Sequence, residues 1–434
     1  MELLNRIDPA TQQTAAGFPD IKTMQSALCF TAAEKERLRS LAGKVAEIAA
    51  LPVQREKAEL WTRHNDLETS QPLVFIDPEN GWNECIPASG LSCADPLARV
   101  WEMYFLKQIY WFEVMRDDKV IDHFFDVPYS YETTGWGVDL KKEGGEQGGA
   151  YKVVQVVGSY ETDFPKLHFP EVIIDEKESE KLLALAESTF GDLLHVRRKA
   201  TWWWTLGMTW DYINLRGLED FMCDFLLEPE WVHRMMEFLC SGLLSRLEGL
   251  QEKNLLPLNT ENTYVGSGGF GFTKELPAER KHVTARDMWG FVESQETTAI
   301  SPELYGEFIF PYHKKIAERF GLMCYGCCEP FDPRWEYVKQ LPRLRRVSCS
   351  PWADWEKIPE LLGKRYVASV KPNPNVLAFP VMEEEAARRD VRRALHATKG
   401  CIPEIIMKDN NTLGGNPGNA ARWVQIVREE IGRL

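Results

Sequence analysis

The chain has 434 residues and a formal net charge of −14, with 51 basic against 65 acidic side chains. Its hydrophobic content of 44% and charged content of 27% are typical of a globular protein of one large or two ordinary domains. No Lys/Arg-rich block of the kind that follows a phosphate backbone is present, which argues against a nucleic-acid partner. No apolar run reaches the roughly 18 residues that span a bilayer, and the amino terminus has no apolar signal core. We therefore expect a cytoplasmic protein with no membrane partner.

Ten cysteines are scattered from Cys29 to Cys401. In a long chain without an export signal we expect no structural disulfides, which leaves free buried thiols or metal ligands. Fifteen tryptophans are also present, and part of this aromatic content could line a pocket.

The amino-terminal half predicts a helical extension followed by mixed structure. A capping-box pattern, Thr31 to Glu34, begins the first helix, and a run of three tryptophans favours a strand because bulky aromatics suit a pleated surface. The elements expected here are helices at 32–50, 95–118, 175–187, 215–227 and 228–252, and strands at 73–77, 151–157 and 200–207.

The carboxyl-terminal half alternates regularly between strand and helix. The expected strands are 287–293, 322–328, 344–350, 366–371 and 402–409, each followed by a helix, the last of which begins near 419. Sustained alternation argues for parallel strands wrapped by helices. We predict an α/β fold of the (β/α)₈ TIM-barrel type, with residues 1–95 as an amino-terminal helical or irregular extension and 96–434 as the barrel. A doubly wound sheet is the alternative.

Polar or ionisable residues follow every predicted strand of this half. A barrel would bring the carboxyl ends of its strands to one mouth, where such folds keep their chemistry. The strand-end residues are Glu293 with Glu296, Cys327 to Glu329, Ser350 to Trp352, Lys371 with Asn373, and Lys408 with Asp409. This recurrence indicates an active site.

The densest of these strand ends is the stretch from Cys324 to Glu329, with three cysteines and a glutamate within six residues. Thiolates and a carboxylate together are ligands that zinc prefers. Two other interpretations stay open: small buried residues of a packed core, or a redox pair within Cys324-x-x-Cys327. A second CxxC motif, which a zinc ribbon would need, is absent from the sequence.

Two further motifs are ambiguous. The run Gly266 to Gly271 lacks the GxxxxGK[ST] lysine of a phosphate loop, so a flexible loop is the expected structure. Trp202 to Trp204 could be core or pocket, and strand alternation would place Trp203 opposite its two neighbours.

The segment from Glu293 to Ile316 resembles the uroporphyrinogen decarboxylase superfamily, in which an acid at a strand end precedes a helix with Ser-Pro, Pro-Tyr and Lys-Lys-Ile. The helix region 215–236 and Asn416-Pro-Gly-Asn-Ala-Ala-Arg-Trp-Val424 are similar to the same family. The resemblance covers roughly residues 200–434 and implies a TIM-type barrel with its site at the carboxyl mouth.

The branches of that superfamily differ in cofactor. The decarboxylases use none and grip substrate carboxylates with an arginine-rich amino-terminal loop, which this sequence lacks. The cobalamin-dependent methyltransferases bind zinc through a His-x-Cys motif and a later Cys; here Tyr325 or Gly326 stands in place of the His, and Asp409 and Asn410 in place of the later Cys. The resemblance therefore implies an altered ligand set, Glu293 with two cysteines, similar to the Glu-Cys-Cys zinc of some related methyltransferases.

The first hypothesis is a zinc-dependent methyltransferase of a corrinoid system, acting on a small methylated substrate. The sequence contains no Asp-x-His-x-x-Gly corrinoid motif, so the corrinoid would come on a separate protein. A homodimer is left open. The roles assigned are metal ligands Glu293, Cys327 and Cys328; catalytic residues Glu296, Lys371 and Asp409; and substrate-binding residues Trp203, Trp352, Asn373 and Lys408. The alternatives are a cofactor-free decarboxylase-like lyase, or a non-catalytic binding relative with the same fold.

Overall fold

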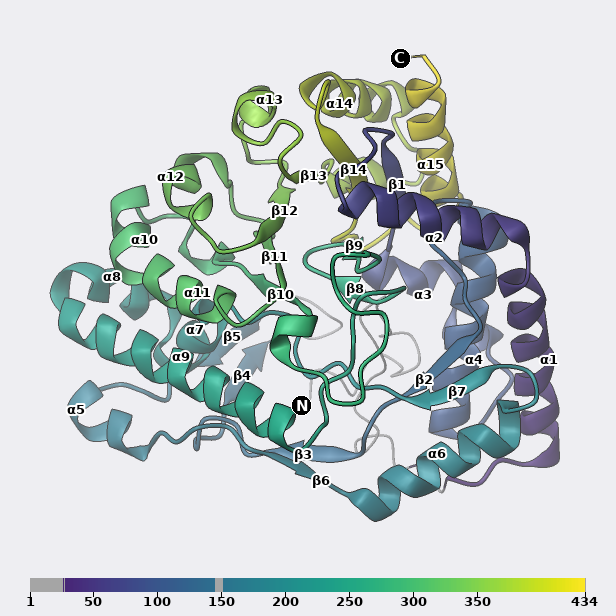
Figure 1. The fold of residues 1–434 in the computed structure, drawn as a ribbon, viewed down its shortest axis with the longest axis horizontal. Helices are drawn as coiled ribbons and strands as arrows, with labels where there is room; N and C mark the ends of the chain where they lie inside the picture. The colour runs from purple at the N-terminus through teal and green to yellow at the C-terminus, as the bar shows by residue number, and fades with distance from the viewer. Residues whose placement is uncertain (1–25, 27, 145–150, 434) are drawn as a thin grey trace.

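The computed structural model describes residue 26, residues 28–144 and residues 151–433 (Figure 1). The first 25 residues of the predicted extension lie outside this description. The protein is a mixed α/β structure built around a six-stranded parallel sheet, in the order β1-β14-β13-β12-β11-β10. Its strands are β1 (Leu73–Ile76), β10 (Trp289–Val292), β11 (Leu322–Tyr325), β12 (Leu344–Cys349), β13 (Val367–Val370) and β14 (Ile402–Met407).

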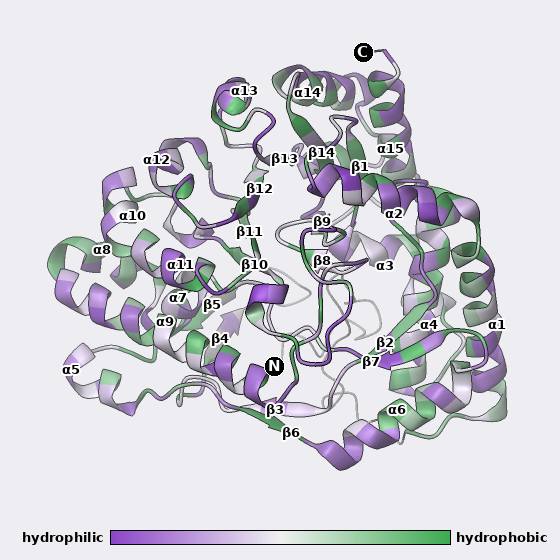
Figure 2. Ribbon diagram, in the orientation of Figure 1, coloured by the Kyte–Doolittle hydropathy of each residue, from purple (hydrophilic) through white to green (hydrophobic). Residues whose placement is uncertain are grey.

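The sheet is buried on both faces. Every residue of β1, β10, β11, β13 and β14 is buried, as expected for parallel strands with near-continuous apolar sequence. Hydrophobic residues are frequent along the strands of the sheet, whereas the surrounding helices carry many hydrophilic residues (Figure 2). Because β1 pairs with β14, the segment predicted as an extension supplies one edge strand of this sheet.

The helices that follow the sheet strands pack around it, with α15 beside β1 (Figure 1). The helices of the carboxyl-terminal half are α10 (Pro302–Phe308), α11 (Phe310–Ala317), α12 (Trp335–Val338), α13 (Ile358–Leu361), α14 (Glu384–Ala397) and α15 (Gly418–Ile431). Those of the first half are α1 (Ala32–Ala49), α2 (Pro52–Asn65), α3 (Trp82–Cys85), α4 (Pro96–Tyr110), α5 (Tyr160–Asp163), α6 (Glu176–Phe190), α7 (Thr209–Arg216), α8 (Leu218–Leu227) and α9 (Pro229–Glu252). No helix in the described ranges combines the length and apolar character needed to cross a bilayer.

A separate parallel pair, β2 (Phe124–Val127) with β7 (His195–Arg198), stands between β1 and β10 in the chain. In the described part of the chain no ladder joins this pair to the six-stranded sheet. Backbone hydrogen bonds instead reach both sheet edges, from Asp118 N to the Val74 carbonyl (2.8 Å) and from Leu206 N to the Phe291 carbonyl (2.9 Å). Two small antiparallel pairs lie in the same half of the chain: β3 (Tyr131–Thr133) with β6 (Val172–Ile174), and β4 (Lys141–Gly144) with β5 (Tyr151–Val154).

Two predicted elements differ from the structure. The strand expected at 200–207 is wrong, since that segment is irregular and its Leu206 bond to Phe291 is not part of a ladder. Trp202 is buried, with its indole N–H donated to the Leu255 carbonyl, while Trp204 is exposed. The single helix expected after Ser301 divides into α10 and α11, because Pro311 has no N–H to continue the first helix.

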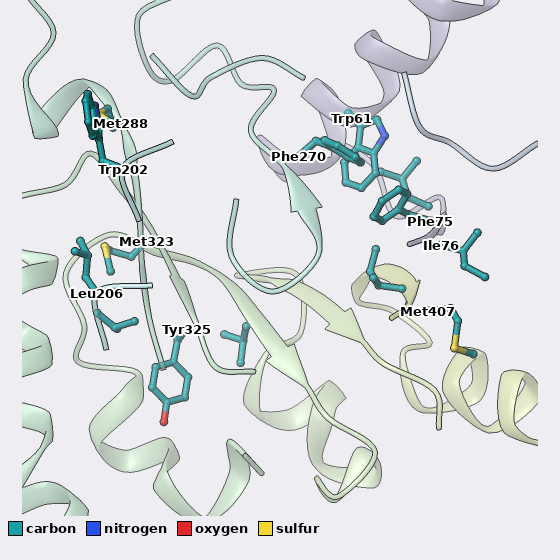
Figure 3. Close-up of a cluster of buried hydrophobic side chains, with 14 of the residues drawn as sticks. Trp61, Phe75, Ile76, Trp202, Leu206, Phe270, Met288, Met323, Tyr325 and Met407 are labelled. Carbon is teal, nitrogen blue, oxygen red and sulfur yellow. The ribbon is translucent and has the colours of Figure 1, made fainter. Parts of the chain in front are cut away.

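The glycine-rich run 266–271 belongs mostly to a buried hairpin, which corrects the predicted flexible loop. Its strands are β8 (Tyr264–Val265) and β9 (Gly269–Phe270), and residues 265–271 are all buried. Phe270 packs edge-on against Trp61 (5.2 Å between ring centroids) and Phe75 (4.9 Å), as Figure 3 shows. Large aromatic contacts of this kind fix the hairpin in the interior.

The hairpin approaches the six-stranded sheet so closely that only glycine fits at positions 266 and 268. A Cβ at Gly266 would lie 2.9 Å from the Cys324 Cβ, and one at Gly268 would lie 2.7 Å from the Ile406 Cγ2. Both glycines have φ values, +69° and +127°, in the region that other residues rarely adopt. The hairpin tip therefore lies against β11 and β14, near the ends that carry the predicted site.

Candidate functional site

Glu329 joins the carboxyl ends of β10 and β11. Its buried carboxylate accepts hydrogen bonds from the backbone N–H groups of Ser294 (2.8 Å) and Cys327 (2.9 Å). The chain turns at Gly326, whose φ of +88° is of the kind that favours glycine. The structure thereby brings the residues that follow these two strands, Glu293 and Cys327, to the same end of the sheet.

The two adjacent thiols lie close together there. The Cys327 and Cys328 sulfurs are 3.8 Å apart; Cys327 is buried and Cys328 half-buried. The Ser267 hydroxyl donates to the Cys327 sulfur at 3.3 Å, and the Cys328 sulfur lies 4.0 Å from Asp409 Oδ2. The third cysteine of the motif is separate in its contacts, since the Cys324 sulfur lies 3.7 Å from an Arg346 guanidinium nitrogen.

Glu293 is a fully buried carboxyl group with one unpartnered oxygen. Its Oε2 accepts from Gln295 N at 3.0 Å, whereas Oε1 has no hydrogen-bond partner. Burial, with the nearby charges of Glu296 and Glu329, raises the pKa of Glu293 well above its usual range. Burial also raises the pKa of Glu296, although the Thr209 hydroxyl donates to its carboxylate at 2.7 Å. Both carboxyl groups therefore favour the neutral form more strongly than an exposed glutamic acid does.

Lys408 places a buried cation beside the thiols. Its ammonium lies 3.4 Å from Asp409 Oδ1, 3.6 Å from Glu79 Oε1 and 3.5 Å from the Ser267 hydroxyl. Each of these distances exceeds the usual 2.7–2.9 Å or so of a charge-assisted hydrogen bond. The ammonium also lies 6.0 Å from the centroid of the Trp204 ring, which is within cation–π range.

The electrostatics of the two lysines differ. Burial alone would lower the pKa of Lys408, but Tyr264, Cys327 and the two carboxylates around it raise that pKa well above its usual range. Burial lowers the pKa of Lys371 to about 8, helped by the charge of Lys408. The Lys371 ammonium is held by the Ser369 hydroxyl at 2.7 Å and its carbonyl at 3.1 Å. Lys408 is thus the permanent cation, and Lys371 the one that can lose its proton near neutrality.

The other three residues predicted to bind substrate, Trp203, Trp352 and Asn373, have no described contact with the two thiols or Lys408. Trp352 is 72% exposed on the loop after β12. Asn373 caps the short turn 374–377 by accepting from Asn375 N, and its own N–H is donated to Asp390. Trp203 lines a narrow cavity of about 60 Å³ between the segment 199–204 and β8 and β10.

Two site residues escaped the sequence analysis. Glu79 lies three residues after β1, and the sequence analysis did not consider the residues after that strand. It begins a short 3-10 helix, Glu79–Gly81, with a φ of +50°. Burial raises its pKa to about 7, against the opposing effect of Lys408. Ser267 lies in the glycine run read as a loop. The glycine run was the one sequence signal of this position. Glycine has no Cβ, so a run of glycines allows the backbone to lie close to the sheet.

The arrangement fits a zinc ion in part. With zinc–sulfur bonds of about 2.3 Å, a tetrahedral site places two sulfurs about 3.8 Å apart, which matches the separation of the two thiols. Glu293 supplies a buried oxygen without a partner. Within the residues that the structure describes, however, no three His, Cys, Asp or Glu side chains are close enough together to hold a metal. The two thiols have the spacing of zinc ligands, and a third ligand would require a side chain to change its position.

Comparisons with known proteins add little. No protein-family model and no curated protein matches the chain. Among solved structures, a methyltransferase from Methanosarcina mazei is similar over 75% of this chain and 85% of its own, with 10% identity and a TM-score of 0.44. A likeness this weak carries no argument about the reaction, so the functional case depends on the site itself.

Proposed function

We propose that the protein is a zinc-dependent methyltransferase that moves a methyl group between a small methylated substrate and a corrinoid on a separate protein. The observation that carries the proposal is the pair of Cys327 and Cys328 sulfurs, 3.8 Å apart at the end of β11. Glu293, whose Oε1 is buried without a partner, would be the third ligand after a change of rotamer. A bound zinc would supply Lewis acidity to a leaving group or to a thiol.

The charges around the thiols support such a site. A zinc ion with two thiolates and one carboxylate carries a net charge of −1, and the Lys408 ammonium beside Cys327 would neutralise it. Deprotonation of Glu293 would release its proton toward Glu296, the neighbouring carboxyl group that also has a raised pKa. Lys371, with a pKa of about 8, could accept or donate a proton at its Nζ.

The fold proposal is a distorted (β/α)₈ barrel. Its eight parallel strands would be β1, β2, β7 and β10 to β14, with the irregular segments at 118 and 206 bridging the two places where ladders are missing. Supporting this, the β8–β9 hairpin lies against β11 and β14 and close to Phe75 of β1, as a plug inside a ring of strands would. The carboxyl mouth would then face the corrinoid protein.

The proposal is tested by methyl transfer to reduced cobalamin, followed by the absorbance change of the corrinoid, with a panel of methylated ethers, amines and thiols. Cys328→Ser should lose transfer while its circular dichroism spectrum and thermal midpoint are kept. Full activity in that variant would refute the proposal. Cys223→Ser, which removes an exposed thiol of α8, is the matched control and should keep full activity.

One observation favours a second candidate, a cofactor-free carboxy-lyase. The described residues assemble no three-ligand metal group, while Glu293, whose raised pKa favours its acid form, would give a proton and the Lys408 cation would bind a carboxylate. Release of carbon dioxide from a carboxylated substrate by protein treated with chelator would favour this candidate over methyl transfer.

A further inference from the structure

Ser267 is the only tip residue of the β8–β9 hairpin, Gly266 to Gly269, that has a side chain, and that side chain is buried. Hydrogen bonds from two buried side chains hold the carboxyl-terminal strand of the hairpin. Asn65 Nδ2 donates to the Phe270 and Phe272 carbonyls at 2.8 Å each, and an Arg346 guanidinium nitrogen donates to the Phe270 carbonyl at 3.3 Å. The tip therefore has a fixed position relative to β11 and β14.

The Ser267 hydroxyl has one proton, and its neighbours determine where that proton points. The Lys408 ammonium has donors only, so at 3.5 Å the hydroxyl oxygen must accept from it. The hydroxyl proton is then left for the Cys327 sulfur at 3.3 Å. The Cys327 backbone is held separately, since Glu329 accepts from its N–H and Ser348 donates to its carbonyl oxygen at 3.0 Å.

We propose that Ser267 is a positioning residue of the site, whose hydroxyl holds the Cys327 sulfur beside the Cys328 sulfur. The backbone contacts fix the Cys327 main chain, whereas its sulfur contacts two side chains in the described structure, the Ser267 hydroxyl that donates to it and the Cys328 thiol itself. Without it the sulfur gains rotamer freedom, and the 3.8 Å separation is one arrangement among several. The inference rests on the proposed function only for the use made of the two thiols.

The test uses phenylarsine oxide, which reports sulfur placement without zinc. Its arsenic forms two As–S bonds with a pair of thiols, both thiol protons leave in one water molecule with the oxide oxygen, and no atom changes oxidation state. Capture at one fixed pH is reversed by titration with 2,3-dimercaptopropanol. The signal is assigned by its loss in the Cys327→Ser/Cys328→Ser double variant.

We expect Ser267→Ala to release the arsenical at about fivefold lower dimercaptopropanol, the effect of losing one net hydrogen bond. The matched control is Ser348→Ala, which removes a buried hydroxyl that contacts the same residue through its carbonyl oxygen and not its sulfur. It should stay within twofold of the wild type. Ser267→Thr, which keeps the hydroxyl, should recover most of the capture.

Equal capture by Ser267→Ala and the wild type would overturn the inference, as would an equal loss in both alanine variants. If Ser267→Ala does not fold, Ser267→Gly takes its place; failure of both while Ser348→Ala folds would make Ser267 a folding residue and would also overturn it. A competition titration with a chromophoric zinc chelator then gives the zinc affinity of each variant. A wild type that captures the arsenical but binds no zinc would refute the proposed function and leave the positioning inference standing.

Discussion

Replacing Glu404 by Gln should destabilise the protein strongly, because Glu404 balances a buried arginine. Glu404 and Arg346 are fully or almost fully buried, with Arg346 Nε 3.0 Å from Glu404 Oε1 and a second guanidinium nitrogen donating to Oε2 at 3.3 Å. The His64 Nε2 atom lies 3.5 Å from Glu404 Oε2. Glutamine keeps the shape but leaves the Arg346 charge unpaired, which typically costs about 3–5 kcal/mol.

The pKa of Glu404 reflects the same interaction. Burial alone would raise that pKa, but Arg346 and His64 outweigh it and lower the pKa from 4.5 to about 2. Because the folded pKa is lowered, the stabilisation is complete above pH 4.5 and is lost as the pH falls toward 2. A shift of that size corresponds to about 3 kcal/mol, in agreement with the mutational range.

The assay is urea unfolding at pH 7, followed by tryptophan fluorescence. The control is Glu275→Gln, which breaks the exposed ion pair of the adjacent residue Arg345, both of whose terminal nitrogens lie 2.7 Å from Glu275 oxygens. The control should cost less than about 1 kcal/mol. Similar losses of unfolding free energy in the two variants would refute the reasoning. So would a wild type that loses no more unfolding free energy between pH 5 and pH 3 than Glu404→Gln does.

Three further variants test other parts of the structure. Since the folded pKa of Lys371 is lowered from 10.5 to about 8, the wild type should gain up to about 3 kcal/mol relative to Lys371→Met in urea unfolding as the pH rises from 8 to 10.5; a pH-independent difference would contradict this. Glu293→Gln, which replaces a carboxyl group whose raised pKa favours its neutral form, should change the unfolding free energy by less than about 1 kcal/mol but reduce zinc retention, and a large loss of stability would contradict this. Gly269→Ala would place a Cβ 2.4 Å from the Arg346 Cζ and should cost about 1–3 kcal/mol in thermal or urea unfolding; wild-type stability would mean that the hairpin is not packed as described.

The parallel strands could be predicted because their sequences are mostly apolar, with Arg345 and Arg346 in β12 and Glu404 in β14 as charged exceptions. The strands expected at 73–77, 344–350 and 402–409 end within two residues of β1, β12 and β14. A strand buried on both faces needs such a run whatever its neighbours are, so the signal is local. Because the strand ends could be located from local sequence, the polar residues after them could be predicted to lie together at one end of the sheet.

What the sequence could not show depends on contacts between distant segments. Ser267 meets Lys408 across 141 positions, and nothing near either residue predicts the contact. The tryptophans at 202–204 have strand-like composition, but the contacts of the segment, such as Trp202 with the Leu255 carbonyl, replace a strand ladder. Composition indicates what suits a pleated surface and not whether a neighbouring strand is there to pair with.

The measurement that tests the central claim most directly is zinc content by plasma mass spectrometry, on protein purified without chelators and on the Cys327→Ser/Cys328→Ser variant. The account predicts close to one zinc per chain in the wild type and none in the variant, with both proteins folded. No zinc in either protein, and none kept after zinc is added and excess removed, would contradict it. The two thiols would then be packing residues of the sheet end, and the carboxy-lyase assay would come next.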